Sequence, residues 1–226
     1  LAQEVNAAVM GVLEAQAGAE IVVWDGHGPG GVNLAELHPE ARLIPRGAFR
    51  PPYTFDRGYD GLLVIGQHAR AGSGGLLCHT YSLEVYRYWL NGREIGELGL
   101  RSFLAGLYDI PVLLVTGDDV ACREARELIP NVVTCPVKET IHSQLAYLRP
   151  PAACQALIRQ TASAAVGNRQ RVPPLRLEPP YAFRAQYLSS ALAETFVAQH
   201  PEAARIDAYT IEVTGPDLLE VIRHVA

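Results

Sequence analysis

The sequence lacks an apolar run long enough to cross a membrane, and its first residues show no basic segment followed by an apolar stretch. A transmembrane helix needs about 20 consecutive apolar residues, and a secretory signal peptide begins with basic residues. Both absences favour a cytoplasmic protein that does not insert into membranes.

The sequence also lacks clustered positive charge. Its formal net charge is -5, and no segment forms a basic stripe. Proteins bind nucleic acids and anionic membranes through such basic surfaces. We therefore expect neither as a partner.

Cysteine is scarce, and its spacing forms no metal-binding or redox motif. The four cysteines (Cys78, Cys122, Cys135 and Cys154) show no Cys-x-x-Cys pattern. A chain of this length needs no disulfides to fold, so reduced thiols are the expected state. Cys78 precedes His79, but adjacent residues on an extended segment point to opposite faces, which disfavours a Cys-His nucleophile pair.

What the sequence does contain is an alternation of short apolar strands and amphipathic helices. Hydrophobic residues make up 49% of the chain, enough for a sizeable core. The pattern predicts strands at 20–24, 41–45, 61–65, 85–90, 93–95, 111–115 and 131–137, and helices over the opening segment, 96–108 and 120–128. Asn91-Gly92 predicts a tight hairpin. This order is typical of an α/β fold with a mostly parallel sheet flanked by helices.

A proline-rich stretch from 172 to 180 predicts a boundary in the chain. Beyond it, an extended segment at 181–187, a helix at 191–198, a strand at 205–213 and a final helix predict a smaller α+β unit. We therefore expect an α/β domain over residues 1–171 and a smaller C-terminal unit over 172–226.

Four ionisable residues lie where open α/β sheets place their ligands, close to the carboxyl ends of strands. His27 and His68 follow predicted strands, His79 follows a glycine-rich loop, and Glu97 begins a predicted helix. Histidine and carboxylate are the usual ligands of a catalytic zinc, which needs about three protein ligands and an open position. Each residue alone is also explained as a loop residue or a helix-end charge, so spacing alone does not establish a metal site.

Several short segments carry a resemblance to a known family. They are Trp24-Asp25-Gly26-His27, Gly66-Gln67-His68-Ala69-Arg70-Ala71, Cys78-His79-Thr80, Asn91-Gly92-Arg93-Glu94-Ile95-Gly96-Glu97-Leu98-Gly99-Leu100 and Gly117-Asp118-Asp119. In this order and at these intervals they resemble the zinc-dependent D-aminopeptidases of bacterial dipeptide operons, peptidase family M55. The resemblance covers the first two-thirds of the chain and is loose in the last third.

The resemblance implies an aminopeptidase with two zinc ions per chain that removes N-terminal D-amino acids, notably D-alanine, from short peptides. His27, His68 and Glu97 match metal ligands, and His79 matches the catalytic nucleophile or base. The family also implies a large ring-like homo-oligomer, a decamer, with its sites facing an internal channel. Histidine and carboxylate sites accept several divalent ions, so the metal used in the cell stays open.

One part of the family pattern is absent from this sequence. The family carries an Asp-x-Glu pair on a first strand, and its aspartate bridges the two metals, whereas no strand precedes the opening helix here. We expect such a strand to lie upstream of Leu1, because the sheet would lose buried area without it.

Arg70 follows His68 by two residues, and we interpret it as a candidate for holding a substrate carboxylate or an oxyanion. Two alternatives stay open for the chain as a whole. Glycine-rich loops after strands could bind phosphate, as in nucleotide-binding α/β enzymes, although neither G-x-x-x-x-G-K-[ST] nor a dinucleotide-binding fingerprint is present. The chain could also be a non-catalytic peptide-binding or assembly protein on the same scaffold.

Overall fold

A computed structural model describes residues 1–27, 30–45 and 51–223 of the chain. The glycine-rich segment 25–31, which follows the first predicted strand in the sequence, lies partly outside these residues. The helices are α1 (Ala2–Ala15), α2 (Glu97–Leu107), α3 (Asp119–Leu128), α4 (Pro151–Gly167), α5 (Ser190–Gln199) and α6 (Leu218–Ile222). The strands are β1 (Ile21–Trp24), β2 (Ala41–Ile44), β3 (Leu62–Gln67), β4 (Val85–Leu90), β5 (Arg93–Ile95), β6 (Val112–Asp118), β7 (Val133–His142), β8 (Leu145–Leu148), β9 (Tyr181–Tyr187), β10 (Ala203–Arg205) and β11 (Thr210–Gly215).

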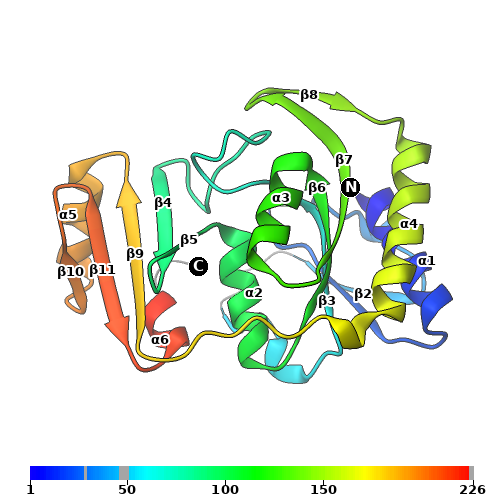
Figure 1. Ribbon diagram of the computed structural model, residues 1–226, viewed down its shortest axis with the longest axis horizontal. Coiled ribbons are helices and arrows are strands. Elements are labelled where there is room, and N and C mark those ends of the chain that lie inside the picture. The colour runs from blue at the N-terminus through cyan, green and yellow to red at the C-terminus, as the bar shows by residue number, and fades with distance from the viewer. Residues whose placement is uncertain (28–29, 46–50, 224–226) are drawn as a thin grey trace.

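The strands form three sheets (Figure 1). β1 and β2 are a parallel pair, and β3, β6 and β7 are parallel, with β8 antiparallel at the edge. The third sheet is antiparallel, in the order β10-β11-β9-β4-β5. The prediction of an α/β fold with parallel strands flanked by helices is confirmed, and the hairpin at 85–95 belongs to the antiparallel sheet.

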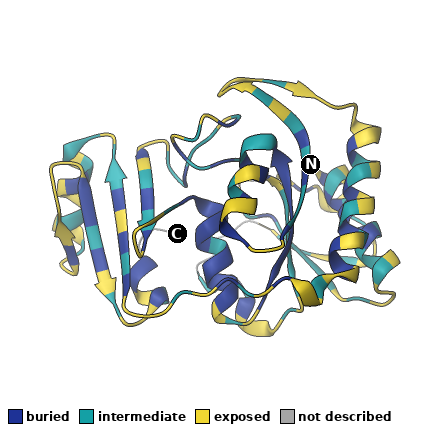
Figure 2. Ribbon diagram, viewed as in Figure 1, coloured by how far each residue is buried: buried dark blue, intermediate teal, exposed yellow. Residues whose placement is uncertain are grey.

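The centre of the molecule is packed around β6 and α2 (Figure 2). All seven residues of β6 are buried, as are most residues of α2, because both elements have protein on every side. At the end of the molecule away from the antiparallel sheet, α1 packs along α4. Gly11 permits this approach, since a Cβ there would lie 2.2 Å from the carbonyl oxygen of Arg159. No helix in the described part of the chain is long and apolar enough to cross a membrane.

The hairpin predicted at Asn91-Gly92 is confirmed. Both residues have positive φ, 49° and 77°, as a type I′ turn requires. The prediction of one strand over 205–213 is wrong, because the chain turns back between β10 and β11. Asp207 causes the turn: its side chain accepts a hydrogen bond from the backbone N–H of Tyr209, which competes with continued strand pairing. Helix α4 and strand β8 were not predicted from the sequence pattern.

The segment beyond the proline-rich stretch does not form a sheet of its own. β9 pairs with β4 on one side and β11 on the other, so the antiparallel sheet contains strands from both predicted units. The division at residue 172 stays a prediction, and it does not coincide with a division between sheets.

Candidate metal centre

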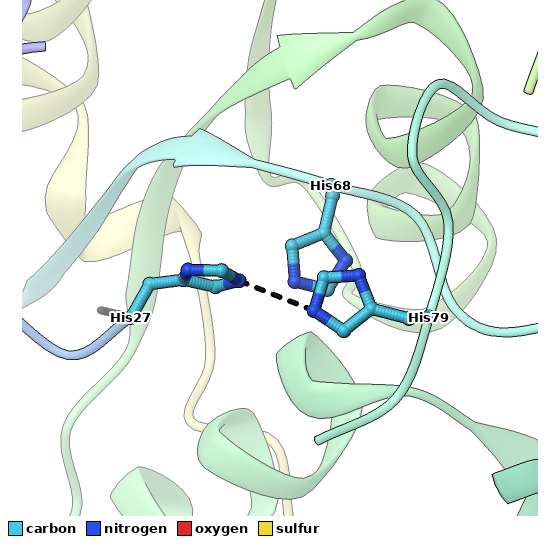
Figure 3. A group of neighbouring side chains, drawn as sticks. All are labelled: His27, His68 and His79. Atoms are coloured by element: carbon cyan, nitrogen blue, oxygen red, sulfur yellow. Dashed lines mark hydrogen bonds between the residues drawn. The ribbon is translucent and has the colours of Figure 1, made fainter. Parts of the chain in front are cut away.

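The structure brings together the four residues that the sequence singled out. His27 lies three residues after β1, His68 directly follows β3, and Glu97 is the first residue of α2. His79 lies in the long loop between β3 and β4. Figure 3 shows the three histidine side chains converging from separate segments of the backbone.

The three imidazoles present nitrogen atoms to one small volume. One ligand atom from each histidine lies within 4.8 Å of the others. Nε2 of His27 is 3.2 Å from Nε2 of His79, and the rings of His68 and His79 are stacked with centroids 3.9 Å apart. His27 is exposed, whereas His68 and His79 are partly buried.

Backbone carbonyl groups orient two of these rings. Nδ1 of His68 lies 3.0 Å from the carbonyl oxygen of Ala69, and Nδ1 of His79 lies 2.8 Å from that of Leu77. Each Nδ1 therefore carries the proton that it donates to the carbonyl, which leaves Nε2 as the nitrogen that can bind a metal. Metal-binding histidines are fixed in this way by their second nitrogen.

The backbone around His79 is unusual. Leu77 and Tyr81, which flank it by two residues, have φ of 51° and 56°, a left-handed conformation rare for such side chains. The conformation serves the site: the Leu77 carbonyl accepts from His79, and the Tyr81 N–H donates to Oε1 of Glu97 at 2.8 Å. Strained backbone of this kind concentrates at functional sites.

Glu97 is a buried carboxylate, with its side chain 3% exposed. Oε1 lies 3.4 Å from Nε2 of His68 and 3.9 Å from Nε2 of His79. Burial alone would raise the pKa of Glu97, but the neighbouring His68 and the positive charge of Arg101 outweigh burial and lower the pKa to about 2. The carboxylate is therefore ionised throughout the physiological range.

Arg101 holds the other oxygen of this carboxylate. Its Nη2 lies 3.1 Å from Oε2 of Glu97, one helical turn away, and 3.4 Å from the carbonyl oxygen of Gly26, the residue before His27. The guanidinium also lies over the rings of Trp24 and Tyr81. One side chain thus contacts the segments that carry His27, His79 and Glu97.

Gly96 allows the loop after His68 to approach the start of α2. A Cβ at Gly96 would lie 2.5 Å from Cβ of Arg70, closer than two such atoms can come. Near this contact, Oε2 of Glu124 accepts a hydrogen bond from the backbone N–H of Arg70 at 2.9 Å. The close approach brings His68 beside Glu97.

The donor atoms fit a zinc ion. Two ligand atoms on one tetrahedral zinc are separated by about 3.4 Å, given metal–nitrogen distances near 2.05 Å. The His27–His79 and His68–Glu97 separations, 3.2 Å and 3.4 Å, are close to this value. In addition, Nε2 of His68 is buried without a hydrogen-bond partner of good geometry among the described residues. A buried nitrogen left in this state is costly unless something binds it.

A cavity of about 620 Å³ opens beside these residues. It extends between β1 and β3, and its walls are mostly apolar side chains from these strands and from α1. In the described part of the chain, β1 pairs only with β2 and β3 only with β6.

Arg70, which the sequence suggested as a substrate-binding residue, does not point into the cavity beside the histidines. Its Nη1 is 2.9 Å from Oε1 of Glu94, and it is not among the residues that line the cavity. Arg101 does line the cavity, although it was not among the residues predicted from the sequence. Its spacing of four residues from Glu97 on a predicted helix was the signal that could have identified the pair.

Comparison with known proteins places the chain in a family. The model of the D-aminopeptidase family, Peptidase_M55, matches residues 1–226. A D-aminopeptidase from Bacillus subtilis (strain 168) is 34% identical over 206 residues, which are 89% of this chain and 74% of that protein.

The fold agrees with this match. The chain is similar to the solved structure of the Zn-dependent D-aminopeptidase DppA from Bacillus subtilis, described as a self-compartmentalizing protease. The TM-score is 0.91 at 32% identity, covering 97% of this chain and 81% of that one. With the converging histidines and buried carboxylate, these matches show that the chain belongs to peptidase family M55, the D-aminopeptidases.

Proposed function

We propose that this protein is a cytoplasmic, zinc-dependent aminopeptidase that releases N-terminal D-amino acids, D-alanine in particular, from short peptides. The observation that carries the proposal is the convergence of three imidazoles beside a cavity, two of them next to the buried, ionised Glu97. Family membership supports the reaction, and the Zn-dependent relative supports the metal. His27, His68 and Glu97 would hold zinc, with two ions per chain as the proposed content.

Bound zinc would lower the pKa of a water molecule and polarise the scissile carbonyl group. Nε2 of His79 faces the same volume and is the ring nitrogen left to exchange a proton, because Nδ1 donates to the Leu77 carbonyl. We assign His79 as the general base: it takes a proton from the attacking water as the water oxygen bonds to the carbonyl carbon. It then gives that proton to the leaving nitrogen as the carbon–nitrogen bond breaks.

The same geometry would also let His79 act as a metal ligand, because its Nε2 lies among the atoms that could hold an ion. Zinc content distinguishes the two roles. A base can be removed without loss of metal, whereas removal of a ligand lowers metal affinity.

The experiment that tests the function is release of the N-terminal residue from D-Ala-D-Ala and from L-Ala-L-Ala, measured on purified protein with its zinc content determined. We expect release of D-alanine from the first peptide at a rate at least about 100-fold above release from the second. Equal rates would contradict the stereochemical part of the proposal. Bound zinc with no release from either peptide would favour a non-catalytic binding protein.

We also propose a ring-like homo-oligomer, a decamer, on the basis of the self-compartmentalizing relative. The β7–β8 hairpin is consistent with a contact between copies: it extends from the body of the molecule (Figure 1), and Tyr147 and Leu148 are 66% and 70% exposed. Apolar side chains on an edge strand are typical of an association surface. Native mass spectrometry tests this, and a monomeric mass would contradict it.

A further inference from the structure

Glu124 is a partly buried carboxylate of α3 that takes no part in the reaction described above. Its Oε2 accepts a hydrogen bond from the backbone N–H of Arg70, two residues after His68, at 2.9 Å. Its other oxygen, Oε1, lies against Gly96, where an added Cβ would be 3.0 Å away. The carboxylate is therefore held between the loop that follows His68 and the residue that precedes Glu97.

The peptide group that contacts Glu124 also contacts His68. The carbonyl of Ala69 and the N–H of Arg70 belong to one planar, trans peptide group, so they point in opposite directions. The carbonyl oxygen accepts from Nδ1 of His68 at 3.0 Å, and the N–H donates to Glu124 at 2.9 Å. One rigid peptide group thus joins the imidazole to the carboxylate through two hydrogen bonds.

These hydrogen bonds lie largely away from water. Ala69 is fully buried, and the side chain of His68 is 14% exposed. Hydrogen bonds in such surroundings are electrostatically stronger than in water, and bonds in a chain polarise one another. A negative carboxylate at the N–H end of the peptide group therefore makes the carbonyl at its other end a stronger acceptor for His68.

The surroundings of Glu124 act on its charge in both directions. Burial raises the pKa of its carboxyl, whereas hydrogen bonds from the backbone of Arg70 and Gly96, together with the positive charge of Arg70, oppose that rise. Donors that point at a carboxylate stabilise its ionised form. The two backbone groups that Glu124 links to the metal centre are thus also the groups that favour its negative charge.

We propose that Glu124 is a positioning residue of the metal centre: through the Ala69–Arg70 peptide group it strengthens the hydrogen bond from Nδ1 of His68, and so makes Nε2 a stronger ligand for a divalent metal ion. Metal-binding histidines donate their second N–H to a carboxylate or a carbonyl, which raises the basicity of the ligand nitrogen. Here the carboxylate acts on the histidine through an intervening peptide group. The inference rests on the proposed function in its use of His68 as a zinc ligand.

Two substitutions separate this role from that of a simple anchor for the loop after His68. Glu124→Gln keeps the length of the side chain and an oxygen that can accept from the Arg70 N–H, but it removes the charge. Glu124→Asp keeps the charge but is shorter by one methylene group, which weakens the hydrogen bond. An anchor would function with glutamine, whereas transmission of the charge to His68 needs both the charge and the hydrogen bond.

The test is zinc affinity, measured on the purified full chain by competition with a chelator of known zinc affinity. Glu124→Gln should weaken zinc binding about 10-fold, the lower end of the loss seen when a partner of a metal-bound histidine is removed. Glu124→Asp should weaken it too. At saturating zinc, kcat for D-Ala-D-Ala should return to within about 3-fold of wild type, because the variants change metal affinity and keep the ligands.

Glu127→Gln is the matched control. Glu127 lies three residues further along α3 and is exposed, so its replacement removes the same charge from the same helix. Its zinc affinity should stay within about 2-fold of wild type, because exposed charges interact weakly with their surroundings.

Equal zinc affinities of Glu124→Gln and Glu127→Gln would overturn the proposal and leave Glu124 as a structural anchor. A loss of kcat that saturating zinc does not restore would also overturn it. Where Glu124→Gln fails to fold, Glu124→Asp decides, and wild-type affinity in that variant contradicts the proposal. Zinc affinity is measured without substrate, so a wild type that binds zinc but releases no D-alanine would contradict the proposed function and leave this inference standing.

Discussion

Glu97 and His27 belong to the same site but are held in different ways. Glu97 is buried at the start of α2, and both its oxygens have partners: the Tyr81 N–H on one side and Arg101 on the other. His27 is exposed, on a loop at the edge of the β1–β2 pair and beside the open cavity. The packed side therefore fixes the carboxylate without a metal, whereas His27, on the open side, would be ordered by the metal that we propose it binds.

The largest expected effect comes from breaking the packed side. Glu97→Gln removes a proposed metal ligand and leaves Arg101 without its counter-charge in a largely buried position. We expect turnover to fall roughly 1,000-fold or more, because several kcal/mol of metal-assisted catalysis are lost. The metal-free protein should also lose up to roughly 3 kcal/mol of stability, measured by urea unfolding after chelation.

His27→Gln is the matched change on the open side. It should lower zinc affinity and turnover strongly but leave the stability of the metal-free protein within about 0.5 kcal/mol of wild type, as expected for an exposed side chain. A loss of metal-free stability equal to that of Glu97→Gln would contradict the difference drawn between the two sides.

The next largest effect is that of His79→Ala. Removal of a general base lowers kcat by about 100- to 10,000-fold. Zinc content per chain, measured by atomic emission, should stay that of the wild type. A loss of zinc together with activity would make His79 a ligand instead.

Arg101 connects the two sides, and its removal should have an intermediate effect. Arg101→Gln frees Oε2 of Glu97 and the Gly26 carbonyl before His27. Loss of such a supporting contact typically weakens metal binding about 10- to 100-fold, measured by competition with a chelator of known zinc affinity. Arg123→Gln breaks an exposed pair of the same spacing, with Asp119, and should leave zinc affinity unchanged. Equal affinities in both variants would show that Arg101 does not support the site.

The smallest effect is expected for Arg70→Ala. Its guanidinium is paired with Glu94 and does not line the cavity, so kcat/KM for D-Ala-D-Ala should change less than about 3-fold. The sequence-based prediction that Arg70 holds the substrate carboxylate stays open until this is measured. A selective rise in KM for D-Ala-D-Ala, with the C-terminal amide of the same dipeptide unaffected, would support the prediction for Arg70.

Much of the fold could be predicted because local signals agreed with the tertiary structure. Apolar runs of strand length gave β3 and β6, and Asn91-Gly92 gave a hairpin whose φ angles only those residues adopt easily. The sheet that this hairpin joins could not be predicted, since β4 pairs with β9, almost 100 residues later in the chain. Pairing of that kind is decided by tertiary packing.

For the site, the sequence indicated which residues are present but not how they are oriented. The resemblance singled out the histidines and Glu97, and the structure brings them together. The left-handed backbone at Leu77 and Tyr81 carries no sequence signal, because glycine or asparagine would normally be expected there. The anchoring of His79 by the Leu77 carbonyl follows from that backbone and could only be seen in the structure.

The measurement that most directly tests the central claim is zinc content and D-alanine release on one preparation, before chelation, after chelation and after zinc is restored. We expect about two zinc ions per chain, loss of release from D-Ala-D-Ala when the metal is removed, and recovery when zinc returns. Release that continues in metal-free protein would contradict the assignment of His27, His68 and Glu97 as the ligands of a catalytic metal.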